Sequence, residues 1–300
     1  MMYEDPYLIK SCIIAEDRKK RPYINETSYT CPFCVGNEKD IEHIRLESKK
    51  PGEDFLIKIV NNKYPICDYP IGTHDVVIDT PSHMEHPKDF SEEHWKILLE
   101  TMQTRWRQLA TSPDVAFIQI FKNYGESAGA SIKHSHWQIV ALNKIPYLVE
   151  LQYAHLNKGG QDSDACYICD MLKKIDNDLI ITENESWLAL APRVSQFPHE
   201  TWVIPKRHRK QYGDLKPEEL QSCGKLLKKL LIAYEHLKEA CAFNICFMSG
   251  GIRNTLDYHF YIKIIPRLSH LAGFELATSC YINTVHPKTH VQLMQTILKE

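Results

Sequence analysis

The sequence predicts an α+β protein formed by tandem duplication of one unit, because the same order of features occurs twice along its 300 residues. Each copy has a Cys-x-x-Cys pair, two strand-like segments, a long amphipathic helix and two further strand-like segments. Each copy also has two histidines that are 51 positions apart. The repeated residues are Cys31, Cys34, His83 and His134 in the first copy, and Cys166, Cys169, His208 and His259 in the second.

The first copy begins with strand-like segments at 55–65 and 74–83. Ser91 is the expected N-cap of the helix that follows, since a serine hydroxyl accepts a hydrogen bond from the first helical turn. A strand at 115–125 and the segment 128–142, which holds His134, complete the copy. The predicted buried face of the helix consists of Trp95, Leu98, Leu99, Met102, Trp106 and Leu109.

The second copy repeats this order after Cys169. Strand-like segments at 186–192 and 200–208 precede a helix over 215–237 that tolerates Pro217 in its first turn. Two more strand-like segments follow, and the last of them holds His259. They are "FNICFMSG" (243–250) and "YHFYIKIIPRL" (258–268).

The two copies differ in length only before their first histidine. Cys34 and His83 are 49 positions apart, whereas Cys169 and His208 are 39 apart. A loop tolerates a difference of ten residues at small entropic cost. The junction falls in the polar stretch 155–164, which predicts an N-terminal domain over 1–155 and a C-terminal domain over 165–300.

Each copy offers two thiolates and two imidazoles. Such a set forms a closed tetrahedral zinc site with no open position, which is structural and not catalytic. The alternative is two chance Cys-x-x-Cys pairs and buried histidines. His83, and not its neighbours His74 or His86, is assigned as the ligand, because only His83 matches His208 in its spacing of 51 to the next ligand histidine. Four further histidines, His199, His270, His286 and His290, are expected on the surface or in loops.

His134, His136 and Gln138 alternate along one predicted strand and therefore share a face, which is either an exposed polar surface or a site. Aligning His134 with His259 places His136 opposite Tyr261 and Gln138 opposite Lys263. If the first histidine binds metal, His136 is left for chemistry that the second copy cannot perform.

Composition limits the choice of function. A formal charge of −2 gives no basic field for duplex nucleic acid. The N-terminus has no apolar run of the length of a signal peptide or membrane span, so a cytoplasmic protein with reduced cysteines is expected.

Nearly the whole chain resembles the galactose-1-phosphate uridylyltransferase branch of the histidine-triad superfamily, which includes the plant-type ADP-glucose phosphorylases. The run "GASIKHSHWQ" (129–138) is its most specific part. Two departures are Ser135, where the classical members have proline, and the absence of a second histidine in "HFYIK" (259–263), so no iron site is transferred. Other matching segments are "RKKRP" (18–22), "CPFC" (31–34), "NNKYP" (61–65), "TPSH" (80–83), "ETWVIPKRH" (200–208) and "IIPRLSHLAGFELATSCYINTV" (264–285).

The resemblance implies two histidine-triad units, each an antiparallel sheet with a long helix, and a homodimer. It implies a ping-pong reaction through a nucleotidyl-histidine on His136, with Gln138 binding the phosphate. It also implies two zinc sites, made of the eight repeated cysteines and histidines. Residues that match nucleotide- or phosphate-binding positions are Arg18, Arg21, Asn62, Asn123, Gly129 and Ser131, and the tail that reaches the sugar contributes Gly273 and Phe274 as candidates.

The expected reaction is nucleotidyl transfer from a nucleoside diphosphate sugar to a hexose 1-phosphate or to inorganic phosphate. A neutral imidazole attacks the α-phosphorus, and its other ring nitrogen should donate to a backbone carbonyl. The alternative is a hydrolase or phosphorylase of dinucleotides or nucleotide conjugates, although Val140 stands where simpler members have a third histidine. A non-catalytic zinc-stabilised protein is the third hypothesis. No residue identifies the nucleobase.

Overall fold

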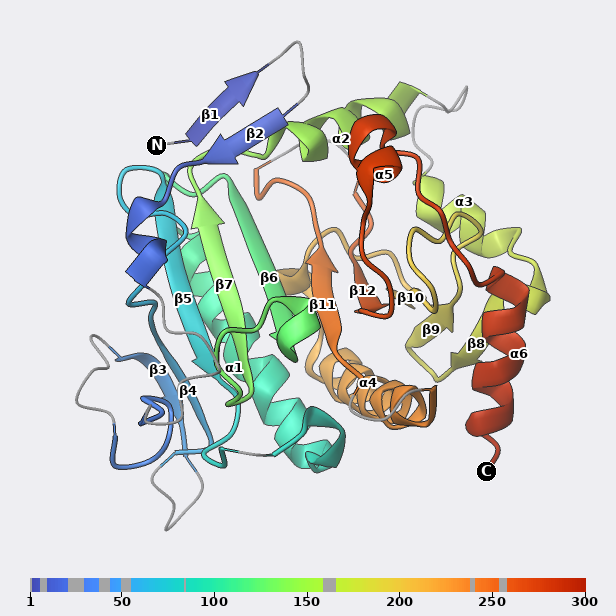
Figure 1. Cartoon of the computed structure of the whole chain (residues 1–300), viewed down its shortest axis with the longest axis horizontal. Helices are drawn as coiled ribbons and strands as arrows, with labels where there is room; N and C mark the ends of the chain where they lie inside the picture. The colour runs from blue at the N-terminus through green and yellow to red at the C-terminus, as the bar shows by residue number, and fades with distance from the viewer. Residues whose placement is uncertain are drawn as a thin grey trace.

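A computed structural model of the chain shows one ten-stranded sheet with helices packed against it (Figure 1). The two-stranded ribbon of β1 and β2 lies apart from this sheet. The structure describes residues 2–5, 10–20, 30–37, 44–49, 55–83, 85–158, 166–237, 241–253 and 258–300.

Every neighbouring pair of strands in the large sheet is antiparallel. The strand order is β3-β4-β5-β7-β6-β11-β12-β10-β9-β8. The strands are β1 (Met2–Asp5), β2 (Lys10–Ile13), β3 (Ile44–Ser48), β4 (Ile57–Asn61), β5 (Gly72–Ile78), β6 (Phe117–Tyr124), β7 (His136–Leu142), β8 (Ile180–Glu183), β9 (Trp187–Leu190), β10 (Thr201–Pro205), β11 (Phe243–Met248) and β12 (Tyr261–Pro266).

The strand order confirms the duplication. Each copy contributes five strands to the sheet. From the outer edge inward, their order is β3-β4-β5-β7-β6 in the first copy and the equivalent β8-β9-β10-β12-β11 in the second. The copies join where β6 pairs with β11, and there Phe121 lies opposite Cys246. These two residues are 125 positions apart, as are His134 and His259. Equivalent residues thus face each other, and an approximate two-fold axis passes between them.

The predicted boundary between the two domains lies close to α2 (Tyr147–Lys158), which runs through position 155. Residues 159–165, which include most of the predicted junction, lie outside the described residues. The division into 1–155 and 165–300 therefore stays a prediction. Both copies nevertheless contribute to one continuous core between the sheet and its two long helices.

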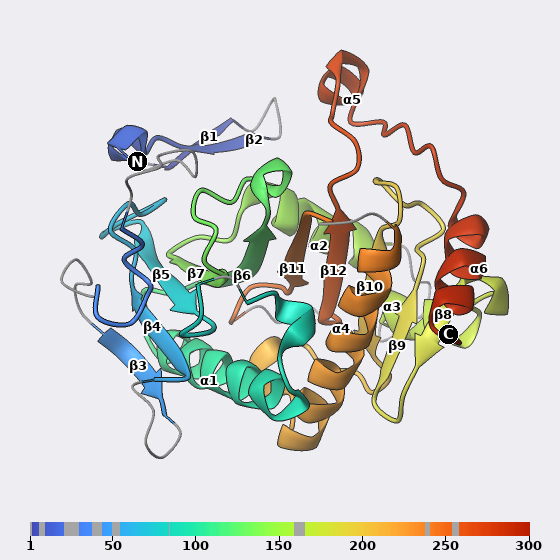
Figure 2. The ribbon, with the colours of Figure 1, turned by 60° about the horizontal axis from the view of Figure 1, so that its bottom comes forward.

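Helices α1 (Glu92–Ala110) and α4 (Pro217–Leu237) pack together against one face of the sheet (Figure 2). The hydroxyl of Ser91 caps α1 by accepting from the backbone N–H of His94 at 3.0 Å. A side chain at Gly224 would bring its Cβ to 2.8 Å from that of Trp95, so glycine permits the close approach of the helices. All six apolar residues predicted for α1 are buried, namely Trp95, Leu98, Leu99, Met102, Trp106 and Leu109.

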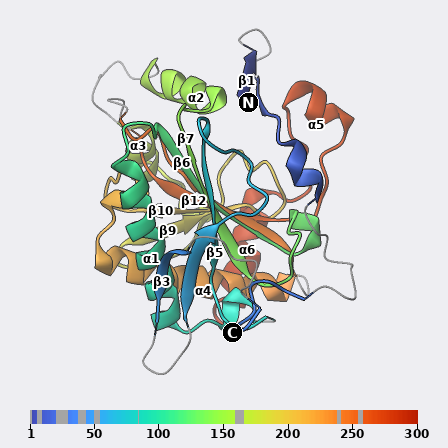
Figure 3. The ribbon, with the colours of Figure 1, turned by 90° about the vertical axis from the view of Figure 1, so that its left-hand side faces the viewer.

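Alternation along β7 assigns its side chains to opposite faces of the sheet. Trp137, Ile139 and Ala141 belong to the core beneath α1 and α4. His136 and Gln138 therefore lie on the other face. Figure 3 shows β1 and α5 (Gly273–Thr278) on the opposite side of the molecule from α4.

Several elements are not evident in the sequence. The outermost strands, β3 and β8, each pair through a register shift, between Ile44 and Leu46 and between Ile180 and Thr182. Strand β7 begins at His136, so His134 lies in the bend before it. The unpredicted helices are α2, α3 (Tyr167–Lys173), α5 and α6 (Pro287–Ile297). No helix in the described ranges is long and apolar enough to cross a membrane.

The expectation that His290 lies on the surface is wrong, because this residue is 2% exposed. Helix α6 inserts it between β10 and α4, where its Nδ1 lies 2.9 Å from Nδ1 of His199 and its Nε2 lies 3.0 Å from the Thr201 hydroxyl. The Tyr234 hydroxyl donates to Thr201 as well. Burial lowers the pKa of His290 to about 3, since a charged imidazole would lose its hydration.

We expect this histidine to make folding stability pH-dependent. The unfolded chain takes up a proton near the usual pKa of 6.5, whereas folded His290 does so only near pH 3. The free energy of unfolding should thus fall below pH 6.5, by about 2 kcal/mol at pH 5 relative to pH 8. Urea unfolding of the wild type and of His290→Gln at both pH values measures this. Protonation of the candidate metal ligands affects both proteins equally and so cancels in the comparison. Equal pH dependence in both proteins would contradict the prediction.

Candidate active site and metal centres

The first set of repeated cysteines and histidines comes together in three dimensions. Cys31 and Cys34 lie in a turn, His83 follows β5, and His134 precedes β7. The Nδ1 atom of His134 lies 3.6 Å from both sulfurs, and Nδ1 of His83 lies 3.3 Å from the sulfur of Cys34. All four candidate ligand atoms lie within 4.8 Å of one another.

This geometry suits zinc. With Zn–S of about 2.3 Å and Zn–N of about 2.05 Å at tetrahedral angles, a sulfur and a nitrogen ligand lie about 3.6 Å apart. The Nε2–H of His134 donates to the Thr80 carbonyl at 2.8 Å, which leaves the Nδ1 lone pair directed at the sulfurs. Four protein ligands leave no open position, so an ion bound here would hold three segments together without contacting substrate.

The second set repeats the arrangement. The Nδ1 atom of His259 lies 3.6 Å from the Cys166 sulfur and 3.3 Å from the Cys169 sulfur, while Nδ1 of His208 lies 3.4 Å from Cys169. His259 donates through Nε2 to the Pro205 carbonyl at 3.0 Å. Pro205 is 125 positions after Thr80, so the orienting carbonyl is duplicated with the ligands.

His136 opens β7 and is 7% exposed. Its Nδ1 lies 2.8 Å from the His134 carbonyl, as expected of an imidazole held for attack through Nε2. Burial lowers its pKa to about 4, so the ring is neutral at pH 7. The ring of Phe33, from the turn that holds the cysteines, packs edge-on against it at 5.4 Å.

A buried lysine holds the backbone at this histidine. Lys122 is 0% exposed and lies on the face of β6 that meets α1. Its ammonium group donates to Asp79 at 2.6 Å, to the Ser135 hydroxyl at 2.7 Å and to the His136 carbonyl at 3.1 Å. The sequence reasoning missed this residue. Its spacing could have revealed it, because Lys122 is two residues from Ile120 and four from Ile118 and therefore shares their buried face of β6. A lysine buried in this way requires an acidic partner.

Gln138 lies on the same face as His136, two residues further along β7. Its Oε1 lies 3.0 Å from Nε2 of His74, a residue that the sequence analysis set aside. The predicted substrate residue Asn62 contacts the same histidine, with its Nδ2 3.2 Å from Nε2. Arg18 donates to the Tyr64 carbonyl at 2.9 Å, which places its guanidinium on the loop that carries Asn62.

The end of β6 and the loop after it hold three more of the predicted substrate positions, Asn123, Gly129 and Ser131. Asn123 lies on the face of β6 that also carries Phe121, the cross-strand partner of Gln138. Asn244 donates through Nδ2 both to Asn123 and to the Ala128 carbonyl, each at 2.9 Å. Gly129 has φ +81° with no atom near its would-be Cβ, and Ser131 is buried.

The remaining predicted substrate residues do not join this group within the chain. Gly273 and Phe274 lie on α5, which stands away from the sheet on an extended arm (Figure 2), and Phe274 is 53% exposed. Arg21 lies outside the described residues.

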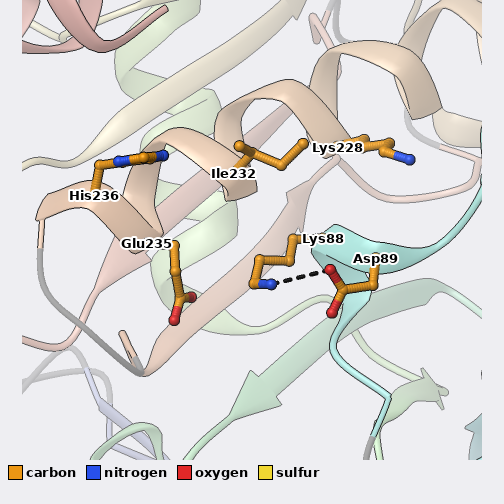
Figure 4. Close-up of a pocket in the computed structure, with 6 residues that line it drawn as sticks. All are labelled: Lys88, Asp89, Lys228, Ile232, Glu235 and His236. Carbon is orange, nitrogen blue, oxygen red and sulfur yellow. Dashed lines mark hydrogen bonds and ion pairs between the residues drawn. The ribbon is translucent and has the colours of Figure 1, made fainter. Parts of the chain in front are cut away.

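A surface hollow of about 370 Å³ lies elsewhere (Figure 4). Helix α4 and the turn before α1 form it, on the helical side of the sheet and thus away from His136. Within it, Lys88 and Asp89 form an ion pair at 2.9 Å. The residues lining it are Lys88, Asp89, Lys228, Ile232, Glu235 and His236.

The chain is similar to known nucleotidyltransferases along most of its length. It is 28% identical to an ADP-glucose phosphorylase from Arabidopsis thaliana, over 98% of this chain and 92% of that protein. It is 27% identical to a galactose-1-phosphate uridylyltransferase from Thermotoga maritima, over 92% of each. It is therefore homologous to both kinds of enzyme.

Solved structures of both kinds of protein are similar to this chain along nearly its whole length. The crystal structure of the Arabidopsis ADP-glucose phosphorylase with bound ADP-glucose matches with a TM-score of 0.83, at 28% identity and 98% coverage of both chains. A uridylyltransferase structure matches with a TM-score of 0.85, covering 99% of this chain and 98% of its own, and at 22% identity shows the shared fold alone. The family model described as a domain of unknown function, DUF4921, matches residues 67–300. The chain thus belongs to the DUF4921 family, within the galactose-1-phosphate uridylyltransferase-like branch.

Proposed function

We propose that the protein transfers a nucleotidyl group from a nucleoside diphosphate sugar through a covalent intermediate on His136. The observation that supports this most directly is the 2.8 Å contact between Nδ1 of His136 and the His134 carbonyl. It places the proton on Nδ1 and the reactive lone pair on Nε2. Gln138 lies two residues away on the same face, within reach of the phosphate that His136 would receive.

In the first step, Nε2 of His136 attacks the α-phosphorus and the bond to the bridging oxygen breaks. The sugar 1-phosphate leaves with that electron pair and needs no strong general acid, because it is a weak base. The imidazole acquires positive charge, which the His134 carbonyl stabilises through Nδ1–H. In the second step, a phosphate oxygen of the acceptor attacks the same phosphorus, and His136 leaves as a neutral ring.

We further propose that both Cys₂His₂ clusters bind zinc in a structural role. The donor types, the separations of 3.3–3.6 Å and the carbonyl-oriented His134 and His259 support this. The first ion would fix the segment that leads into His136. A homodimer is proposed on the family resemblance alone.

Two reactions fit this site. One is phosphorolysis, as in an ADP-glucose phosphorylase, with inorganic phosphate as acceptor. The other is exchange with a hexose 1-phosphate, as in a uridylyltransferase. Hydrolysis of dinucleotides or nucleotide conjugates is the alternative, in which water takes the place of the acceptor.

The nucleophile can be identified directly. We expect brief mixing with ADP-glucose or UDP-glucose to add one AMP or UMP to the wild type and none to His136→Ala, as read by intact-protein mass spectrometry. Tyr261→Phe, the equivalent position in the second copy, is the matched control and should form the adduct normally. A diadenosine polyphosphate tests the hydrolase.

The base of the adduct identifies the nucleotide, and a chase with inorganic phosphate or hexose 1-phosphate identifies the acceptor. Free nucleotide without an acceptor would favour the hydrolase. No adduct and no product with any of the three compounds would contradict nucleotidyl transfer from these substrates.

The metal sites should differ in their effect on chemistry. We expect two zinc ions per chain by elemental analysis, and the loss of one in either Cys31→Ser or Cys166→Ser. Cys31→Ser should slow adduct formation strongly because the first cluster includes His134, whereas Cys166→Ser should mainly lower the melting temperature. Full zinc content in either variant would show that its cluster does not hold the metal.

A further inference from the structure

The side-chain contact between Gln138 and His74 joins neighbouring strands of the catalytic copy. Strands β5 and β7 pair so that Val76 lies opposite Gln138, which makes His74 its diagonal neighbour on the same face. Nε2 of His74 lies 3.0 Å from Oε1 of Gln138, and the two residues are 3% and 6% exposed. The contact is thus buried beside His136.

A backbone group settles which atom of this contact carries the proton. The N–H of Ile66 points at Nδ1 of His74 over 2.9 Å. A peptide N–H can only donate, so Nδ1 must accept and carries no proton. The proton of the neutral ring is then on Nε2, which donates to Gln138. The oxygen of Gln138 is the acceptor, and its N–H₂ group is turned away from His74.

A second backbone group orients the neighbouring amide in the same way. The N–H of Tyr64 donates to Oδ1 of Asn62 at 2.8 Å, so the amide nitrogen of Asn62 faces the His74 ring. That nitrogen lies 3.4 Å from Nδ1 and 3.2 Å from Nε2. Because Nε2 is already a donor, Asn62 can share only the Nδ1 lone pair, at a longer distance than Ile66.

We propose that His74 is a positioning residue, which fixes the Gln138 amide so that its N–H₂ group, and not its oxygen, meets the transferred phosphate. This rests on the proposed function. A glutamine without such a partner can turn its carbonyl toward the phosphate, and that orientation is repulsive. No acceptor among the described residues takes the Gln138 N–H₂ group, which leaves it for a phosphate oxygen.

The second copy supports a role in chemistry over one in folding. His199 is the equivalent of His74, 125 positions later, and Lys263 is the equivalent of Gln138. There, His199 contacts His290 at 2.9 Å, while Lys263 lies 3.4 Å from Glu200. The fold persists without a pair like that of His74 and Gln138, which occurs only in the copy that has His136.

The test measures the rate of adduct formation and the affinity for nucleotide sugar separately. His74→Leu should slow adduct formation roughly 10- to 100-fold, somewhat less than loss of a phosphate donor, with little change in affinity. His74→Gln should restore most of the rate, because its oxygen can accept from Ile66 while its nitrogen donates to Gln138. His199→Asn, which suits the φ of +61° at that position, is the matched control and should retain the wild-type rate.

A double-mutant cycle separates positioning from general damage. If His74 acts through Gln138, the His74→Leu/Gln138→Ala double variant should be about as slow as Gln138→Ala alone. Multiplied effects, or a normal rate in His74→Leu, would overturn the proposal while leaving the proposed function intact. A wild type that forms no adduct would overturn both.

The ring's protonation can be read without activity. Nitrogen-15 chemical shifts of labelled wild-type protein, assigned through the signal lost in His74→Gln, should show Nδ1 bare and Nε2 protonated. The opposite tautomer would overturn the proposal even if His74→Leu were slow or failed to fold.

Discussion

The buried ammonium group of Lys122 makes the interactions on which the first copy, the one that contains His136, depends. A lysine that is 0% exposed is tolerable only with a carboxylate and further acceptors around it. Asp79, Ser135 and the His136 carbonyl supply these, and they come from the end of β5 and the start of β7. Loss of one partner of a buried ion pair typically lowers the free energy of unfolding by about 3–5 kcal/mol, so separation of these two strand ends is strongly unfavourable.

This requirement accounts for the relation between the first Cys₂His₂ cluster and His136, the proposed nucleophile. Thr80, next to Asp79, accepts from His134, which is next to Ser135. The same short segments therefore carry the charge network on one side of the sheet and the metal ligands with His136 on the other. Ser135 takes part through its hydroxyl, which a proline at this position could not do.

The features that could be predicted from the sequence were those with a spacing. The offset of 51 between His83 and His134 predicted the residues that form the two Cys₂His₂ clusters, and the helical period predicted the buried face of α1. The missed features depend on contacts between distant segments. Nothing local distinguishes His74, which contacts Gln138, from His290, which is buried by α6, and the short strands β3 and β8 have too few residues to show alternation.

The two copies share the Cys₂His₂ cluster but differ at the position of His136. Tyr261 stands where His136 does, and its ring packs against Trp202 at 4.7 Å. Lys263 replaces Gln138 and lies beside Glu200. The carbonyl that orients the ligand histidine is nevertheless present in both copies, at Thr80 and Pro205. The copies therefore differ in the polar residues on the sheet face that carries His136 and Gln138, whereas the geometry of the Cys₂His₂ cluster is the same in both.

The register shifts in β3 and β8 bear on how the two outer edges of the sheet resist pairing with other chains. Duplication of an open antiparallel sheet leaves two outer edges, and an exposed edge invites pairing with another chain. A bulge twists such an edge and interrupts its row of hydrogen-bonding groups. Gln295 of α6 also donates to the Ile180 carbonyl at 2.8 Å, which occupies one position on the β8 edge. Among the described residues, the β3 edge has its register shift and the charged side chains of Arg45 and Lys49, so removing those charges should favour edge-to-edge aggregation there.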